Sequence, residues 1–258
     1  MLFTRRGTLK LGLAGVAGFG ASTTIMPFVA RAQAQGDTYE IEGGEIVIFP
    51  IAHASFVMTA PGMVVYNDPV GEAAAYEGHP APDLILITHE HQDHYNAETL
   101  AALVGDGTRL VTNPAVFGML PEALKSKATS IGNGENTTVG ELRIEAIPAY
   151  NTTPDRQQYH PQGRDNGYVL TIGGRRVYIA GDTEDIPEMR ALSDIYVAFL
   201  PMNLPYTMDI DQASSAVAEF KPAFVYPYHY RGSDPEAFAA KVAEAGVETK
   251  VVMGPWYS

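Results

Sequence analysis

The sequence contains no cysteine and few basic residues. With no Cys among its 258 residues, disulfide bonds, thiolate metal sites and cysteine nucleophiles are all excluded. Any bound metal must be held by His, Asp, Glu or Asn. Lys and Arg number 17 against 30 Asp and Glu, and the net charge at pH 7 is −13. An acidic surface repels phosphate backbones, so nucleic acid is not an expected partner.

The composition is otherwise that of an ordinary globular protein. Hydrophobic residues make up 46% of the chain and charged residues 18%, and the length is sufficient for a layered core. One folded domain is therefore expected, and the sequence leaves its oligomeric state open.

The first 32 residues form a segment to be set aside from that domain. Arg5 and Arg6 precede the apolar stretch 11–30, and Ala30 and Ala32 are small residues at the positions that a signal peptidase reads. The segment resembles a twin-arginine export signal, which implies that twin-arginine export machinery carries the folded precursor to the periplasm. We expect cleavage near Ala32, which removes four basic residues and no acid and changes the net charge from −13 to −17. The alternative is a membrane anchor facing the periplasm, for which the glycines and proline of the stretch are poorly suited.

The remaining residues divide into a polar flexible lead, 33–44, and a domain, 45–258. Short early strands are followed by strands that alternate with helices, which predicts an α/β fold with two sheets packed face to face and helices outside. A long polar loop, 152–166, interrupts the domain and is expected to be functional. The expected strands are 46–49, 52–58, 63–66, 84–87, 110–112, 142–147, 168–172, 177–180, 196–200, 224–227 and 248–252, and the expected helices are 96–104, 114–124, 187–192, 210–220 and 235–245.

Three histidines and two acids lie together in the signature loop, residues 88–94, which reads Thr-His-Glu-His-Gln-Asp-His. The loop directly follows the apolar run 84–87, where a buried strand is expected to end. Alternate residues of an extended chain share a face, so His89 and His91 can bind one ion. Asp93 and His94 lie beyond the bend, where they can bind a second ion or brace the first. Imidazole and carboxylate are ordinary ligands of zinc, iron and manganese, and a polar surface loop rarely concentrates so many.

The signature loop resembles that of the metallo-β-lactamase superfamily: His, any residue, His, any residue, Asp, His. Every defined position is filled, and the resemblance extends from about Glu45 onward, closest to the lactonase-like and uncharacterised metal-dependent hydrolase branch. It implies a four-layer αββα sandwich and two divalent metal ions, zinc first, with manganese or iron as options. It also favours a small molecule as substrate.

Three more ligand-type residues follow expected strands: Asn151, Asp182 and His229. In the resembled family a middle His completes site one, an Asp bridges the metals and a late His completes site two. Asp182 and His229 match the bridging Asp and the late His. Taken alone, however, Asp182 could equally be an ordinary turn aspartate and His229 an ordinary core histidine. The middle position holds Asn151, whose amide oxygen is a weaker and harder ligand than imidazole. The favoured interpretation places Asn151 in or near the shell, and the alternatives are that His160 takes this role or that the centre holds one metal.

Other polar residues are candidates for supporting roles. His53 and Asp68 are expected either to back the ligand imidazoles or to be structural. Arg164 and Arg231 are natural anchors for an anionic substrate, although each can be a surface charge. Tyr206 is expected to line the substrate pocket together with its neighbours Met202, Asn203 and Met208.

These residues predict a hydrolase in which a metal-bound hydroxide attacks a lactone, ester, amide or phosphodiester. Asp93 and Asp182 are the expected catalytic carboxylates, with Asp93 or a metal-bound water handling the proton. Two divalent ions, two carboxylates and a hydroxide leave a formal charge of about +1, so the site attracts anions. The alternatives are an iron-dependent oxidoreductase on the same fold and a non-catalytic protein that binds a metal or ligand.

Overall fold

The computed structural model describes residues 36–257. The predicted export signal, residues 1–32, lies outside the described residues. Within the described range, no helix is long and apolar enough to span a bilayer.

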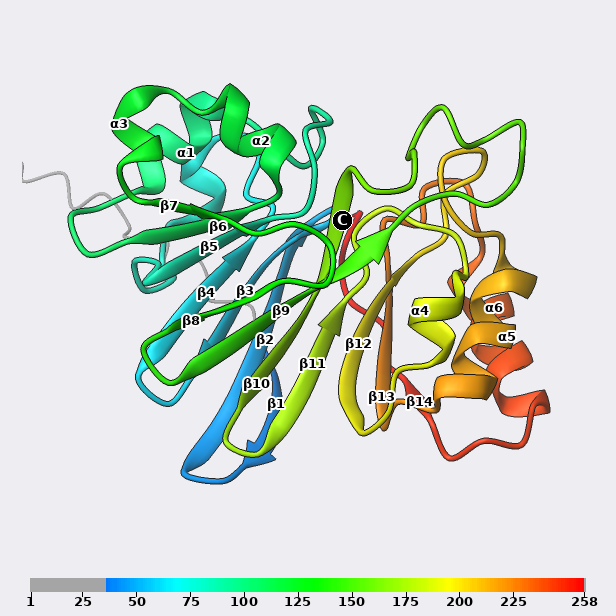
Figure 1. Ribbon diagram of the computed structural model, residues 1–258. Coiled ribbons are helices and arrows are strands. Elements are labelled where there is room, and N and C mark those ends of the chain that lie inside the picture. Colours follow the sequence, from blue (N-terminus) through cyan, green and yellow to red (C-terminus); the bar gives the residue numbers. More distant parts are fainter. Residues whose placement is uncertain (1–35, 258) are drawn as a thin grey trace, which may run out of the picture. The chain divides into compact units, whose positions relative to one another are not determined.

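The first sheet has seven strands in sequence order (Figure 1). Its first four strands form an antiparallel meander and the next three run parallel to the fourth. The strands are β1 Asp37–Ile41, β2 Gly44–Ala52, β3 Ser55–Ala60, β4 Met63–Asn67, β5 Leu84–Ile87, β6 Arg109–Thr112 and β7 Ala128–Ser130.

The prediction of a flexible lead at 33–44 is wrong from Asp37 onward, because β1 pairs with β2. Its anchor is Tyr39, which is buried and packs edge-on against Phe224 at a ring separation of 4.8 Å. One buried aromatic ring among alternating polar residues is enough to hold an edge strand, and sequence composition alone did not reveal it.

The second sheet also has seven strands and runs in the reverse order, from β14 to β8. Antiparallel pairs join β8 to β11, and parallel pairs join β11 to β14. The strands are β8 Asn136–Val139, β9 Leu142–Ala149, β10 Asp165–Ile172, β11 Arg175–Ile179, β12 Ile195–Pro201, β13 Phe224–Tyr228 and β14 Lys250–Val251. Strands β7 and β8 lie between the expected strands 110–112 and 142–147, where no strand was predicted.

Helices cover the outer face of each sheet (Figure 1). The predicted helix 114–124 is two short helices, because Pro121 lacks an amide hydrogen and cannot continue the first. The helices over the first sheet are η1 Ala73–Tyr76, α1 Ala97–Leu103, α2 Pro114–Met119 and α3 Glu122–Lys125, and those over the second are α4 Pro187–Arg190, α5 Ile210–Phe220 and α6 Pro235–Glu244.

The main core lies between the two sheets and takes side chains from both. Phe56 of β3 stacks on Phe199 of β12 at a ring separation of 4.2 Å, and Phe199 stacks on Tyr226 of β13 at 5.0 Å. Two further cores join each sheet to its helices. These three layers of contact confirm the predicted four-layer αββα sandwich.

Polar loops gather where parallel strands of both sheets end. Strands β4 and β5 lead to Asp68 and the signature loop, while β11 and β13 lead to Asp182 and His229. In open α/β sheets the carboxyl ends of the strands are the usual location of a binding site. The packed sheets bring these four positions to a common rim.

Candidate metal centre

The signature loop is a tight turn that follows β5. The backbone N–H of His94 donates to the carbonyl of His91 at 2.9 Å, and that of Tyr95 donates to the same carbonyl at 2.8 Å. The turn brings Asp93 and His94 back beside His89, whose ring lies 4.0 Å from that of His94. The loop therefore contributes ligand-type atoms to two neighbouring clusters.

The first cluster consists of three imidazoles, His89, His91 and His160. One nitrogen of each lies within 4.8 Å of the others, and His89 Nε2 is 3.1 Å from His91 Nδ1. His160 is buried, and its Nδ1 donates to Asp165 Oδ2 at 2.9 Å. This bond fixes the tautomer and leaves the lone pair of His160 Nε2 facing the cluster.

Asn151 lies next to this cluster and has a different set of contacts. Its Nδ2 donates to the carbonyls of Arg156 and Tyr206 at 3.1 and 2.7 Å, and its backbone N–H donates to the carbonyl of His160 at 2.8 Å. These bonds hold the loop that carries His160. The structure thus brings His160, the alternative weighed from the sequence, beside His89 and His91.

The second cluster consists of Asp93, His94 and His229, with His53 against its outer side. One ligand atom of each lies within 4.8 Å of the others. His229 Nε2 is 3.4 Å from Asp93 Oδ2, and the His229 ring stacks on that of His94 at 5.2 Å. Strand β13, the signature loop and the β2–β3 turn therefore meet at this point.

Asp68 lies on the side of His94 that faces away from the cluster, as expected for a residue that orients an imidazole by a hydrogen bond. Its Oδ2 accepts from His94 Nδ1 at 2.8 Å and from the Thr88 hydroxyl at 2.7 Å, while its Oδ1 accepts from the Thr88 N–H at 2.8 Å. These contacts are buried, and they leave His94 Nε2 facing inward.

Asp182 lies between the two clusters. Its Oδ2 is 3.2 Å from His229 Nε2 and 3.4 Å from His160 Nε2, and its Oδ1 is 3.3 Å from His94 Nε2. The turn that positions it depends on Gly181, which has φ of +65°, and a Cβ there would lie 2.7 Å from the carbonyl oxygen of Asn166. Asp182 thus reaches both clusters because the residue before it is a glycine, which permits the turn.

The donor atoms have the spacing that divalent ions require. The ligand-type imidazole nitrogens that contact Asp93 and Asp182 lie 3.2 to 3.9 Å from a carboxylate oxygen. Two donors about 2.1 Å from one ion at a tetrahedral angle are about 3.4 Å apart. Buried atoms without a hydrogen-bond partner include His94 Nε2, His160 Nε2, His229 Nε2 and Asp182 Oδ1. Such atoms are costly unless something binds them, so these residues fit metal ions.

The charges of the metal-free cluster depend on burial and on its two carboxylates. Burial lowers the pKa of His229, but Asp182 and Asp93 outweigh burial and raise that pKa to about 10. The pKa of His94 is also raised, since Asp182 and Asp68 outweigh burial. Burial takes the pKa of His89 well below its usual value. The second cluster therefore holds protons that a cation must displace.

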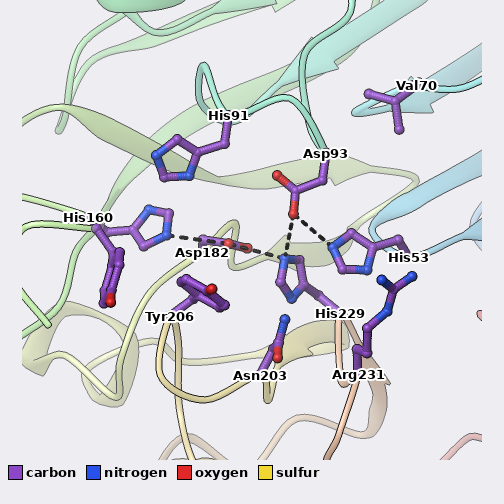
Figure 2. Close-up of a pocket in the computed structure, with 11 residues that line it drawn as sticks. His53, Val70, His91, Asp93, His160, Asp182, Asn203, Tyr206, His229 and Arg231 are labelled. Carbon is purple, nitrogen blue, oxygen red and sulfur yellow. Dashed lines mark hydrogen bonds and ion pairs between the residues drawn. The ribbon is translucent and has the colours of Figure 1, made fainter.

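A cavity of about 720 Å³ opens over the clusters (Figure 2). His91, Asp93, His160 and His229 lie at its base, and its outer wall is formed by Val70, Tyr159, Asn203, Tyr206 and Arg231. Tyr206 lines this cavity, and so does Arg231, whose role as an anchor for an anionic substrate stays a prediction. Met202 and Met208 instead pack in the core beneath α5.

The prediction of Arg164 as a substrate anchor is wrong, because its guanidinium is already bonded to acids. It contacts Glu90 Oε1 at 3.0 Å and donates to Asp165 at 2.7 and 2.9 Å. Arg164 therefore holds Asp165 against His160.

His53 contacts a carboxylate as well as an imidazole. Its Nε2 is 3.0 Å from Asp93 Oδ2, and its ring lies 3.8 Å from that of His229. Its Nδ1 is 2.7 Å from the hydroxyl of Tyr257, a residue that sequence reasoning did not single out. Tyr159 and Asp165 were also missed, and no spacing in the sequence pointed to any of the three.

The fold and the paired clusters define a metallo-β-lactamase type of domain. A sequence profile described as "Beta-lactamase superfamily domain" matches residues 48–229. A UPF0173 metal-dependent hydrolase from Pyrococcus furiosus is 30% identical over 218 residues, which cover 79% of this chain and 93% of the relative. The chain therefore belongs to the UPF0173 family of metal-dependent hydrolases with the metallo-β-lactamase fold.

Solved structures agree with this assignment. A Parabacteroides distasonis protein named as a metal-dependent hydrolase is 43% identical with a TM-score of 0.78, and the match covers 84% of this chain and 97% of that one. CmlA, a diiron β-hydroxylase from Streptomyces venezuelae, is 18% identical with a TM-score of 0.63, over 83% of this chain and 53% of that one. This second likeness is one of fold alone.

Proposed function

We propose that the protein holds two divalent metal ions, zinc before manganese or iron, and hydrolyses a small molecule with an anionic group. The bond cleaved is a lactone, ester, amide or phosphodiester. The observation that carries the proposal is the location of Asp182, with Oδ2 near His160 and His229 and Oδ1 near His94. A carboxylate that contacts both clusters suits a ligand shared by two ions.

The ligands follow from the two clusters. His89, His91 and His160 would hold one ion, and Asp93, His94 and His229 the other, with Asp182 shared. His160 takes the place first considered for Asn151, because its free Nε2 joins the imidazole cluster while the Asn151 amide nitrogen is committed to two carbonyls.

Bound divalent ions lower the pKa of water from about 15.7 to around 7 and polarise a carbonyl or phosphoryl oxygen. The protein then has to position the substrate and move a proton. Asp93 suits the proton transfer, because its carboxylate is about half exposed at the cavity base whereas Asp182 is buried. In the metal-free protein its pKa is lowered, because hydrogen bonds from His229 and His53 outweigh burial.

Arg231 suits the anionic part of the substrate. It lines the cavity, and among residues 36–257 no carboxylate pairs with it. Two divalent ions against Asp93 and Asp182 also leave the centre cationic within an acidic protein. The cavity volume suits a small molecule rather than nucleic acid. The twin-arginine resemblance of residues 1–32 supports export to the periplasm, with the membrane-anchored form as the alternative.

Metal analysis of the purified protein, combined with a panel of chromogenic lactones, esters, amides and phosphodiesters, tests the proposal. We expect two zinc ions per chain and turnover of at least one anionic substrate, with both reduced in His91→Ala. Stoichiometric iron together with oxygen consumption would contradict hydrolysis. Activity that persists unchanged in His91→Ala would contradict a metal mechanism.

A further inference from the structure

His53 occupies an unusual backbone position at the turn between β2 and β3. Its φ is +52°, in the left-handed region that residues other than glycine seldom adopt. The backbone is held there from two sides, since the His53 N–H donates to the carbonyl of Trp256 at 3.0 Å and its carbonyl accepts from the His229 N–H at 3.0 Å. An unfavourable conformation retained beside a site suggests a functional role for the side chain.

The side chain of His53 joins Asp93 to Tyr257. A carboxylate only accepts hydrogen bonds, so His53 Nε2 carries the hydrogen and donates to Asp93 Oδ2 at 3.0 Å. In the neutral ring Nδ1 is then an acceptor, and the Tyr257 hydroxyl donates to it at 2.7 Å. The same hydroxyl accepts a hydrogen bond from the backbone N–H of Arg231 at 3.2 Å. The four groups form one directed chain of hydrogen bonds from Arg231 to Asp93.

Asp93 needs such support more than its neighbours do. Its side chain is 51% exposed, whereas those of His94 and Asp182 are buried and packed. Its carboxylate has two imidazole neighbours in the described part of the chain, His53 and His229. Once His229 Nε2 binds an ion it cannot donate a hydrogen bond, so His53 is left as the donor that orients Asp93.

We propose that Tyr257 and His53 are positioning residues, which fix Asp93 as a ligand of the second ion through the bonds from the Tyr257 hydroxyl to His53 and from His53 to Asp93. The proposal rests on the proposed two-metal function. The ring of Tyr257 has a second contact, since the Arg231 guanidinium lies over it at 5.6 Å. The segment that follows β14 thus supports both a metal ligand and the proposed anion anchor.

Zinc titration of the metal-free full-length protein tests the proposal without a substrate. Tyr257→Phe removes the hydroxyl and keeps the ring beneath Arg231. We expect the affinity for the second zinc ion to fall about 10-fold or more, the usual effect of removing a partner that orients a ligand, while the first ion binds as in the wild type. The measurement is calorimetric titration combined with competition against a chromophoric chelator.

Tyr230→Phe is the matched control. Its ring packs edge-on against that of Tyr257 at 4.9 Å, and its hydroxyl, the group that the substitution removes, takes no part in the chain of hydrogen bonds from Arg231 to Asp93. It is expected to bind both ions like the wild type.

His53→Asn provides a second, independent variant, because asparagine tolerates the left-handed backbone but is too short to join Asp93 to Tyr257. We expect His53→Asn to lower the affinity for the second ion at least as much as Tyr257→Phe does. The double variant should bind the second ion no more weakly than His53→Asn alone. Three results would each overturn the positioning role. Tyr257→Phe could bind the second ion like the wild type, the losses of affinity could add in the double variant, or both ions could be bound equally more weakly. A wild-type protein that binds no metal would instead refute the proposed function on which this role rests.

Discussion

The two clusters that share Asp182 differ in charge and in exposure. The first consists of imidazoles alone, and Arg164 and Asp165 brace His160 from behind. The second includes the half-exposed carboxylate of Asp93 together with His94 and His229, whose pKa values are raised. The first cluster is therefore preorganised, and burial lowers the pKa of His89 and His91, whereas the second must exchange protons for its ion. We expect the first to bind its ion more tightly and the second to be more sensitive to pH.

The largest effect is expected where the clusters join. Asp182→Asn keeps the shape of the side chain but removes the charge near His94, His160 and His229, so both ions should be lost and hydrolysis should fall by about 1000-fold or more. Plasma mass spectrometry of the dialysed protein measures the metal content. Asp211→Asn, an exposed acid paired with Lys241 on α6, is the control and should retain both ions. Retention of both ions by Asp182→Asn would show that the clusters are independent.

A change at the first cluster should remove one ion and leave the other. His160→Ala deletes an imidazole nitrogen that faces Asp182, so we expect one ion per chain. Asn151→Ala should retain two ions, although it loosens the loop through the lost bonds to the carbonyls of Arg156 and Tyr206. The opposite pattern, with Asn151→Ala losing an ion and His160→Ala keeping two, would assign the ligand to Asn151.

Proton release should distinguish the second cluster from the first. In the metal-free protein the raised pKa keeps His229 protonated at pH 7, and the pKa of His94 is shifted in the same direction, whereas ions bind the neutral rings. Metal binding at pH 7 should release about one proton from His229 in addition to the proton of bound water, and the His229 contribution should decline as the pH rises towards the His229 pKa of about 10. Calorimetry in buffers of different ionisation enthalpy counts the protons. A release that does not depend on pH would contradict these charge states.

The smallest effect is expected at the cavity wall. Arg231→Gln should raise KM for an anionic substrate about 10-fold and leave kcat nearly unchanged, because the guanidinium binds the substrate away from the reacting bond. A neutral analogue should show no change in KM. Arg164→Gln provides the comparison, since it loosens Asp165 behind His160 and should reduce metal retention instead. An equal rise in KM for neutral and anionic substrates would exclude Arg231 as an anion anchor.

Sequence reasoning located the candidate ligands that lie close together or at strand ends. The signature loop is contiguous, and Asp182 and His229 follow strands whose apolar pattern is clear. His160 was harder to choose, because the loop 152–166 has no periodicity and Asn151 occupied the expected position.

Contacts between distant segments were not predictable from the sequence. His53 and Tyr257 are 204 residues apart and meet only because the two sheets pack face to face. In the sequence Arg164 looked like a cation without a partner, because only the fold brings Glu90 beside it. The β1 strand was missed for the same reason, since Tyr39 packs against β13 from the far end of the domain.

Anomalous diffraction at the zinc edge from crystals of the zinc-loaded protein tests the central claim most directly. We predict two peaks on either side of Asp182, one among His89, His91 and His160 and the other among Asp93, His94 and His229. A single peak, or a peak bound by Asn151 with His160 turned away, would contradict the account.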